Sequence, residues 1–214
     1  MYKRQRLLIA GPPDERYPEA ARRARELGIA DRLDGFARTA FSDDDKAFIQ
    51  NAVYFFLATA DAKGRPDCSF KGGLPGFVKV TGPNEVDFAD YDGNGMYLST
   101  GNTLENPAVG LLFIDFENRK RFRLNGTASI VPAGSIEPAY LEAQFVVKVH
   151  VTQVFPNCPR YIHKMQMVER SSFAPRVGVT TPVPAWKRME WSCDVLPEGD
   201  PARLPDDPGG RAGA

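Results

Sequence analysis

The sequence predicts a mainly β fold of the α+β class, an antiparallel sheet or barrel that follows a helical extension at the N-terminus. Between residues 53 and 155 lie short runs rich in β-branched and aromatic residues, separated by turn signals of Gly, Pro, Asn and Asp. The first fifty residues carry the start and stop signals of helices instead. Short helices between some of the β runs complete the prediction.

The N-terminal extension is expected to hold two helices. Pro18 begins the first and Gly28 ends it, because proline fits the first helical turn and glycine fits the end. Ser42 is a good N-cap for the second, and the acidic run 43–45 favours the positive helix start.

The elements after the extension follow in order along the chain. We expect strands at 53–60, 67–73, 76–80, 85–91, 109–116, 121–131 and 145–155. Two connecting helices are expected, one at 98–107, which ends at Pro107, and one at 135–144. The domain organisation is then a helical extension at 1–50, a barrel domain at 51–195, and a disordered tail at 196–214, which has almost no apolar residues.

Composition excludes several classes of function. Lys and Arg total 27, as do Asp and Glu, so the chain lacks the basic excess that a general nucleic-acid binder needs. The longest apolar run is far short of a membrane span, and the apolar core of the N-terminal segment is too short for a signal peptide. We therefore expect a cytoplasmic protein of 214 residues with neither nucleic acid nor membrane as partner.

A hydroxyl and an ammonium group share one face of the strand 67–73. Because side chains alternate along a strand, Ser69 and Lys71 lie on one face, and Cys68 and Phe70 lie on the other. Glycines follow and allow the backbone to approach a ligand closely. This set suits a phosphate. It also fits the polar outer face of an ordinary hairpin, and the residues alone leave both interpretations open.

Two arginines are paired in the same way on the strand 121–131. Arg121 and Arg123 lie on one face by alternation, backed by Phe122 and Leu124 on the other. Such a pair can aim its guanidinium groups into a shared cleft, where anions or ring oxygens are the natural partners. A solvated basic edge strand is the alternative.

No metal site is expected. The turn 92–95 resembles part of a calcium loop, but the twelfth position counted from Asp90 is Gly101 rather than Glu. Three widely spaced cysteines and two histidines are too few for a zinc site. The backbone amides of this turn remain a candidate anion-binding nest.

The order of these motifs resembles a known family. The motifs are a strand with Ser-x-Lys, a strand ending in FADY, a polar turn, a helix closing in ENP, and then VGLLFIDF and RFRLNG. This order resembles the pyridoxamine 5′-phosphate oxidase-like, FMN-binding split β-barrel superfamily over about residues 51–131, and CPRYIHK resembles its predicted flavin-nucleotide-binding branch. The resemblance implies an antiparallel split β-barrel, FMN as cofactor, and a homodimer with the flavin at its interface.

The resemblance also implies site residues. Lys71 matches a lysine that meets FMN. The Ser-Arg-Lys phosphate clamp of the family matches residues 93–95, which carry no charge, so Lys71, the arginine pair and backbone amides would hold the phosphate instead. The cofactor-binding residues expected on this basis are Ser69, Phe70, Lys71, Gly72, Phe88, Ala89, Asp90, Asn94, Arg121 and Arg123.

The implied function is an FMN-dependent oxidoreductase that performs hydride or electron transfer with a small-molecule substrate or electron donor. The family's C-terminal Arg-Leu-His segment is not found, so we do not expect oxidation of pyridoxamine phosphate itself. His163 and Tyr161 are the candidate acid–base residues. A non-catalytic flavin-binding or sensing module and a ligand-free interaction barrel are the alternatives. The resemblance leaves open whether FMN, a deazaflavin or haem is bound.

Overall fold

The computed structural model describes residue 28 and residues 38–136, 138–156, 158–192 and 194–203. The chain forms two compact units, residues 1–167 and residues 168–214. The first expected helix, from Pro18 to Gly28, lies outside the described residues except for Gly28, as does the end of the chain from residue 204. The boundaries expected at 51 and 195 remain predictions.

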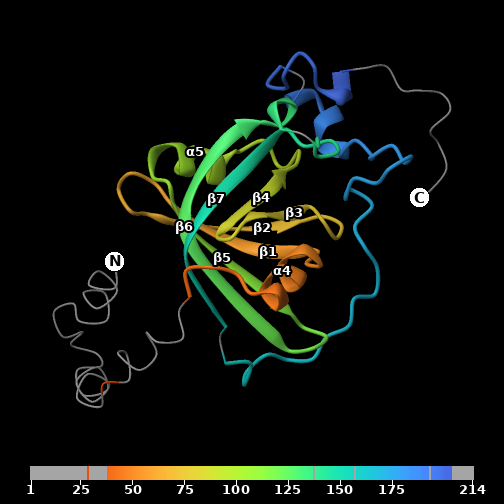
Figure 1. Cartoon of the computed structure of the whole chain (residues 1–214). Helices are drawn as coiled ribbons and strands as arrows, with labels where there is room; N and C mark the ends of the chain where they lie inside the picture. Colours follow the sequence, from red (N-terminus) through yellow and green to blue (C-terminus); the bar gives the residue numbers. More distant parts are fainter. Residues whose placement is uncertain (1–27, 29–37, 137, 157, 193, 204–214) are drawn as a thin grey trace, which may run out of the picture. The chain divides into compact units, whose positions relative to one another are not determined.

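The first unit is built on one antiparallel sheet of seven strands (Figure 1). Its spatial order is β2-β1-β5-β6-β7-β4-β3. Within the described residues the edge strands β2 and β3 do not pair with each other, so the sheet is not closed. This confirms the expected antiparallel split barrel. The strands are β1 Tyr54–Ala60, β2 Pro66–Gly72, β3 Val78–Gly82, β4 Glu85–Asp90, β5 Ala108–Asp115, β6 Lys120–Pro132 and β7 Phe145–Pro156.

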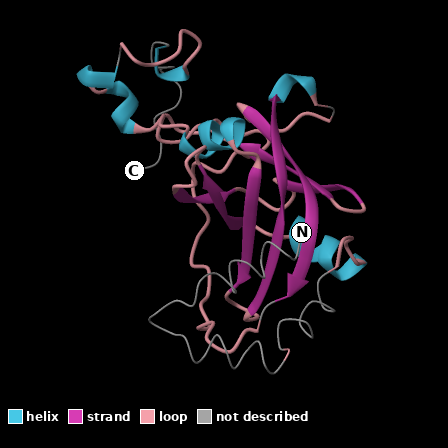
Figure 2. Ribbon diagram, turned by 90° about the vertical axis from the view of Figure 1, so that its left-hand side faces the viewer, coloured by secondary structure: helices cyan, strands magenta, loops and turns pink. Residues whose placement is uncertain are grey.

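Alternation along the strands places one apolar face inside. Figure 2 shows the strands side by side and curved. The core side chains include Phe55, Leu57, Leu111, Phe113 and Leu124, all nearly or fully buried. Phe55 packs its ring 5.0 Å from that of Phe113. Burial of such side chains stabilises a fold by about 1.5–3 kcal/mol each, which is why the period-two pattern fixes which face is inside.

Two α-helices of the described residues match expectation. Helix α4 spans Asp43–Gln50, and Ser42 and Asp45 form a reciprocal capping box at its start. Helix α5 spans Leu98–Glu105 and ends before Pro107, whose ring cannot continue a helix. Helix α4 packs against β3, whereas α5 packs against β1, β2 and β6.

The helix expected at 135–144 is wrong. The described residues of this segment form a 3₁₀ turn at Ala133–Ser135 and then a loop. Pro138 lacks a backbone N–H for a helical bond. Tyr140 is buried against Ala89 and Val146, and its hydroxyl donates to the backbone oxygen of Asp87 at 3.3 Å. Packing of one aromatic ring on the sheet therefore overrides the local helical preference.

The second unit has short 3₁₀ turns at Ala185–Arg188, Glu190–Ser192 and Pro201–Arg203. Lys187 Nζ lies 2.5 Å from Asp200 Oδ2, and each side chain is only 4% exposed. Leu196 is also buried. Throughout the described part of the chain, every helix is too short or too polar to cross a membrane.

Candidate cofactor site

Polar side chains from three elements meet between the edge strand β2 and strand β4, which lie near opposite ends of the sheet order. They are Ser69 and Lys71 of β2, Asp90 at the end of β4, and Ser99 and Thr100 in the first turn of α5, and we call them the β2–α5 cluster. The hydroxyls of Ser69 and Ser99 lie 2.9 Å apart. Lys71 Nζ donates to Asp90 Oδ1 at 2.7 Å, and Thr100 Oγ1 donates to Asp90 Oδ2 at 3.1 Å.

The register of β2 explains why Ser69 and Lys71 share this cluster. β2 pairs with β1 so that Lys71 lies opposite Phe55 and Ser69 opposite Leu57. Partners across an antiparallel pair point to the same side. The two polar side chains therefore extend the inner face of the sheet at its edge strand, where α5 covers them. The alternation expected from sequence is confirmed.

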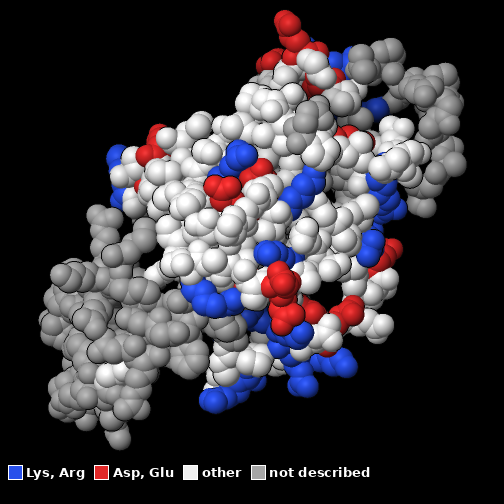
Figure 3. Space-filling model, viewed as in Figure 1, with Lys and Arg blue, Asp and Glu red and all other residues white. Residues whose placement is uncertain are grey.

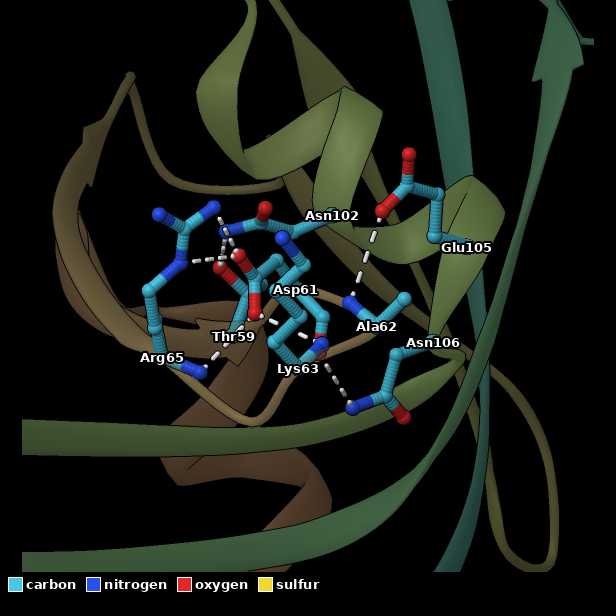
Figure 4. A network of polar contacts seen from close by, with 8 residues as sticks. All are labelled: Thr59, Asp61, Ala62, Lys63, Arg65, Asn102, Glu105 and Asn106. Carbon is cyan, nitrogen blue, oxygen red and sulfur yellow. Dashed lines mark hydrogen bonds and ion pairs between the residues drawn. The ribbon is translucent and has the colours of Figure 1, made fainter.

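A second polar network holds the C-terminal end of α5 over the β1–β2 hairpin (Figure 4). Asn102 Nδ2 donates to Thr59 Oγ1 at 3.1 Å, and the backbone N–H of Ala62 donates to Glu105 at 3.4 Å. In the hairpin, Asp61 accepts from the backbone N–H and the guanidinium of Arg65, which hold the pKa of Asp61 below its ordinary value. The helix that carries Ser99 and Thr100 is thus fixed at both ends.

The start of α5 has the character of an anion site. Its N-cap, Tyr97, is in the left-handed region with φ 49, and no side chain caps the helix there. The first N–H groups of a helix have no acceptor within it. With the hydroxyls of Ser99 and Thr100 and the ammonium of Lys71, the cluster offers several donors to a ligand oxygen. Asp90 is the one acidic member of the cluster.

The arginine pair lies on the opposite face of the sheet. Arg123 of β6 pairs with Leu112 of β5, which pairs with Phe56 of β1. Phe56 is the neighbour of Phe55 and points the other way. The structure therefore does not bring Arg121 and Arg123 together with Lys71 within one chain.

Each arginine of the pair is partly anchored. Arg121 donates from Nη2 to the backbone oxygen of Cys158 at 2.9 Å, while its buried Nε finds no hydrogen-bond partner among the described residues. Arg123 lies 5.2 Å over the ring of Phe155. Burial, followed by the charge of Arg121, lowers the pKa of Arg123. An orphaned, buried N–H is costly, so an acceptor at Arg121 would be stabilising.

Aromatic rings cover the same outer face. Tyr54 stacks on Phe70 at 5.6 Å and on Phe116 at 6.2 Å, and Phe70 is 63% exposed. Phe56 meets the ring of Phe70 edge-on at 5.9 Å. The outer face thus combines a flat apolar surface with two cationic side chains. On the face seen in Figure 3, positive and negative side chains lie beside one another.

The other expected cofactor residues have different surroundings. The ring of Phe88 is fully buried in the core, and Ala89 is 2% exposed. Gly72 leaves room for the ring of Phe70, since an added Cβ would lie 2.7 Å from it. Asn94 is exposed and accepts the backbone N–H of Met96. Phe88 therefore serves the packing of the barrel in this chain.

The candidate acid–base residues lie on the segment after β7. Tyr161 is 87% exposed and His163 is exposed as well. The segment is tied to the end of β5, since the backbone N–H of Met165 donates to the backbone oxygen of Phe116 at 3.2 Å. The backbone oxygen of Cys158, in the same segment, accepts a hydrogen bond from Arg121, so the segment runs beside the arginine pair.

Sequence reasoning missed Ser99 and Thr100. It placed the counterpart of a phosphate clamp in the turn 93–95, whereas the structure brings the first turn of α5 to Ser69 and Asp90. The available signal was a Ser-Thr pair at the start of an expected helix, where anions bind.

One comparison with known proteins identifies the family of the region that contains the sheet. Residues 41–166 match the model of a family described as pyridoxamine 5′-phosphate oxidase. No curated protein matches. Similar solved structures include HupZ of Group A Streptococcus, with 21% identity, 54% of this chain and 93% of that chain covered, and a TM-score of 0.43.

Two further similar structures carry different descriptions. An FMN-binding protein from Syntrophomonas wolfei subsp. wolfei has 13% identity, 65% and 96% coverage of this chain and that chain, and a TM-score of 0.41. HutZ, a haem storage protein from Vibrio cholerae, has 17% identity, 56% and 92% coverage, and a TM-score of 0.35.

Proposed function

Because this chain belongs to the pyridoxamine 5′-phosphate oxidase family, whose model matches residues 41–166, we propose that it binds FMN and acts as an oxidoreductase on a small substrate. The observation that carries the proposal is the β2–α5 cluster. Lys71, three hydroxyls and the uncapped start of α5 converge between β2 and β4. Such donors suit the phosphate of a mononucleotide.

Bound FMN would supply the hydride or electron transfer, and the chain would bind and orient it. Lys71 Nζ and the hydroxyls of Ser69, Ser99 and Thr100 would donate to phosphate oxygens. The aromatic rings of the outer face, Tyr54 and Phe70 among them, offer a flat apolar wall. Arg121 Nε, buried without a partner among the described residues, would donate to an oxygen of the ring system.

We also propose a homodimer, because Lys71 and the arginine pair lie apart within one chain. Three strand spacings divide β2 from β6, about 14 Å, and the two groups also point to opposite faces. One FMN can meet Lys71 and an arginine pair together only if the second copy of the chain supplies the arginines. The exposed ring of Phe70, on the arginine face, supports an interface there.

The first experiment asks which cofactor the purified chain carries. We expect a yellow protein that releases FMN on denaturation, identified by its mass. A deazaflavin or a haem released instead would replace the cofactor of the proposal. A colourless protein that also fails to take up added FMN would contradict flavin binding altogether.

A second experiment separates an enzyme from a non-catalytic flavin module. Under anaerobic conditions, we expect NADH or NADPH to reduce the bound flavin, followed by re-oxidation on addition of oxygen or a quinone. A flavin that neither nucleotide reduces, and that does not re-oxidise after chemical reduction, would favour the sensing module.

A further inference from the structure

An ion pair occupies the centre of the β2–α5 cluster. Lys71 Nζ and Asp90 Oδ1 are 2.7 Å apart, and the side chains are only 17% and 12% exposed. Water therefore screens this pair less than it screens an exposed surface pair. The charge of Lys71, which the sequence assigns to a phosphate, already has a partner in the folded chain.

Asp90 is held in place by several contacts. Its second carboxylate oxygen accepts from Thr100 Oγ1 at 3.1 Å. Its backbone oxygen accepts from the N–H of Gln144 at 3.0 Å, and the residue is the last of β4. A carboxylate fixed by donors on two elements does not swing freely away when an anion arrives. Asp90 is therefore a fixed member of the β2–α5 cluster, which we treat as one subsite.

The sum of the charges in the cluster is zero. Lys71 contributes one positive charge and Asp90 one negative charge, and the remaining members, Ser69, Ser99 and Thr100, are neutral. A phosphate dianion beside Lys71 is attracted by the ammonium and repelled by the carboxylate at a comparable distance. The neutral hydroxyl groups of a phosphate-free ligand are not repelled by the carboxylate, because a hydroxyl can donate a hydrogen bond to it.

We propose that Asp90 is a specificity-determining residue of this subsite, one that limits the preference of the chain for FMN over its phosphate-free analogue, riboflavin. This inference rests on the proposed flavin binding. Asp90 neutralises Lys71 and offers an acceptor to ligand hydroxyls. The negative charge of Asp90 therefore reduces the margin by which the wild-type chain prefers FMN to riboflavin.

The test measures the dissociation constants of FMN and of riboflavin by flavin fluorescence on the full chain. In Asp90→Asn, Lys71 keeps its charge and loses its counter-ion. We expect the ratio of the riboflavin constant to the FMN constant to rise about tenfold. A ratio that stays the same or falls overturns the inference.

A matched control lies on the same strand. Asp87 is 3% exposed, pairs with Lys148 at 3.3 Å, and is three residues before Asp90, so it points to the other face of β4. Asp87→Asn removes the same charge from the same strand, and its ratio should equal that of the wild type. An equal rise in both variants would mean that overall charge, not the pair with Lys71, sets the ratio, and would overturn the inference.

Two further outcomes are distinguishable. If Asp90→Asn does not fold, Asp90→Ser keeps an acceptor for Lys71 and Thr100 without the charge, and the same rise is expected from it. If the wild-type chain binds neither flavin, the proposed function fails and this inference fails with it. Flavin binding with an unchanged ratio in the folded variants overturns the inference alone.

Discussion

Ser69 on the edge strand and Ser99 in the first turn of α5 share a hydrogen bond of 2.9 Å, although thirty residues separate them in sequence. This contact joins β2 to the helix start and brings the donors of both elements to one place. Lys71 and Thr100 follow each of these serines closely and meet at Asp90. The predictions on ligand binding below depend on this arrangement.

Replacement of Lys71 by alanine should weaken FMN binding. The variant loses a charge-assisted contact worth about 1.5–3 kcal/mol and leaves the carboxylate of Asp90 without its counter-ion near the phosphate. Titration of flavin fluorescence measures the change. Lys79→Ala is the control, because Lys79 lies on β3 rather than β2. Its Nζ is 3.8 Å from the centroid of the Tyr140 ring, outside the β2–α5 cluster. Unchanged FMN affinity in Lys71→Ala would refute the phosphate role.

Mixed dimers should restore a site that two single variants lack. Lys71→Ala and Arg123→Leu should each weaken FMN binding, because each removes one group from both sites of the proposed dimer. In a dimer of one variant with the other, one site keeps both groups. Dimers isolated through two different tags should therefore bind one FMN with wild-type affinity. Binding no tighter than that of the parent variants would argue against a site shared between copies.

Gly126→Ala should destabilise the chain. Gly126 lies at the irregularity of the β6–β7 pairing, and an added Cβ would overlap the backbone oxygen of His150. Because backbone cannot move aside as a flexible side chain does, we expect a loss of about 1–3 kcal/mol in the free energy of unfolding. Chemical denaturation measures it.

Gly101→Ala is the matched comparison. Gly101 lies inside α5, and an added Cβ there meets nothing within 4 Å. Alanine is the better helix former by about 0.5–1 kcal/mol, so this variant should be stabilised. Equal losses in the two variants would show that the contact with His150 does not decide the outcome.

Stability should depend on pH through Asp45. Burial raises the pKa of Asp45, but hydrogen bonds to its carboxylate from Arg38 and from the backbone N–H of Ser42 lower it by more, so the folded-state pKa lies below the ordinary value. The stabilisation is therefore complete above about pH 4, the range of an unfolded Asp, and is lost as the pH falls through the lower folded-state value.

Thermal unfolding of Asp45→Asn tests this sign. At pH 7 the variant should be less stable than wild type by about 0.5–2 kcal/mol, and the difference should shrink below about pH 4. Asp43→Asn removes the same charge from a side chain that is 98% exposed, and its difference from wild type should be small throughout. A gap between Asp45→Asn and wild type that widens in acid would contradict the assignment.

Local pattern was sufficient for most elements of the fold. Period-two alternation predicted the strands and the opposite directions of Lys71 and Phe70, and Ser42 predicted the start of α4. It failed at 135–144, where the buried ring of Tyr140 holds the chain as a loop. That contact depends on β4 and β7 lying side by side, which no local pattern encodes.

For the site, the sequence by itself determined which residues share a face of one strand, because alternation depends only on neighbours along the chain. It therefore identified Ser69 with Lys71 and Arg121 with Arg123. Which face turns inward, and which strand neighbours which, depend on pairings between distant segments. Only the tertiary structure placed the arginines across the sheet from Lys71, brought α5 to β2, and set the carboxylate of Asp90 against Lys71, a charge that the sequence had assigned to a phosphate.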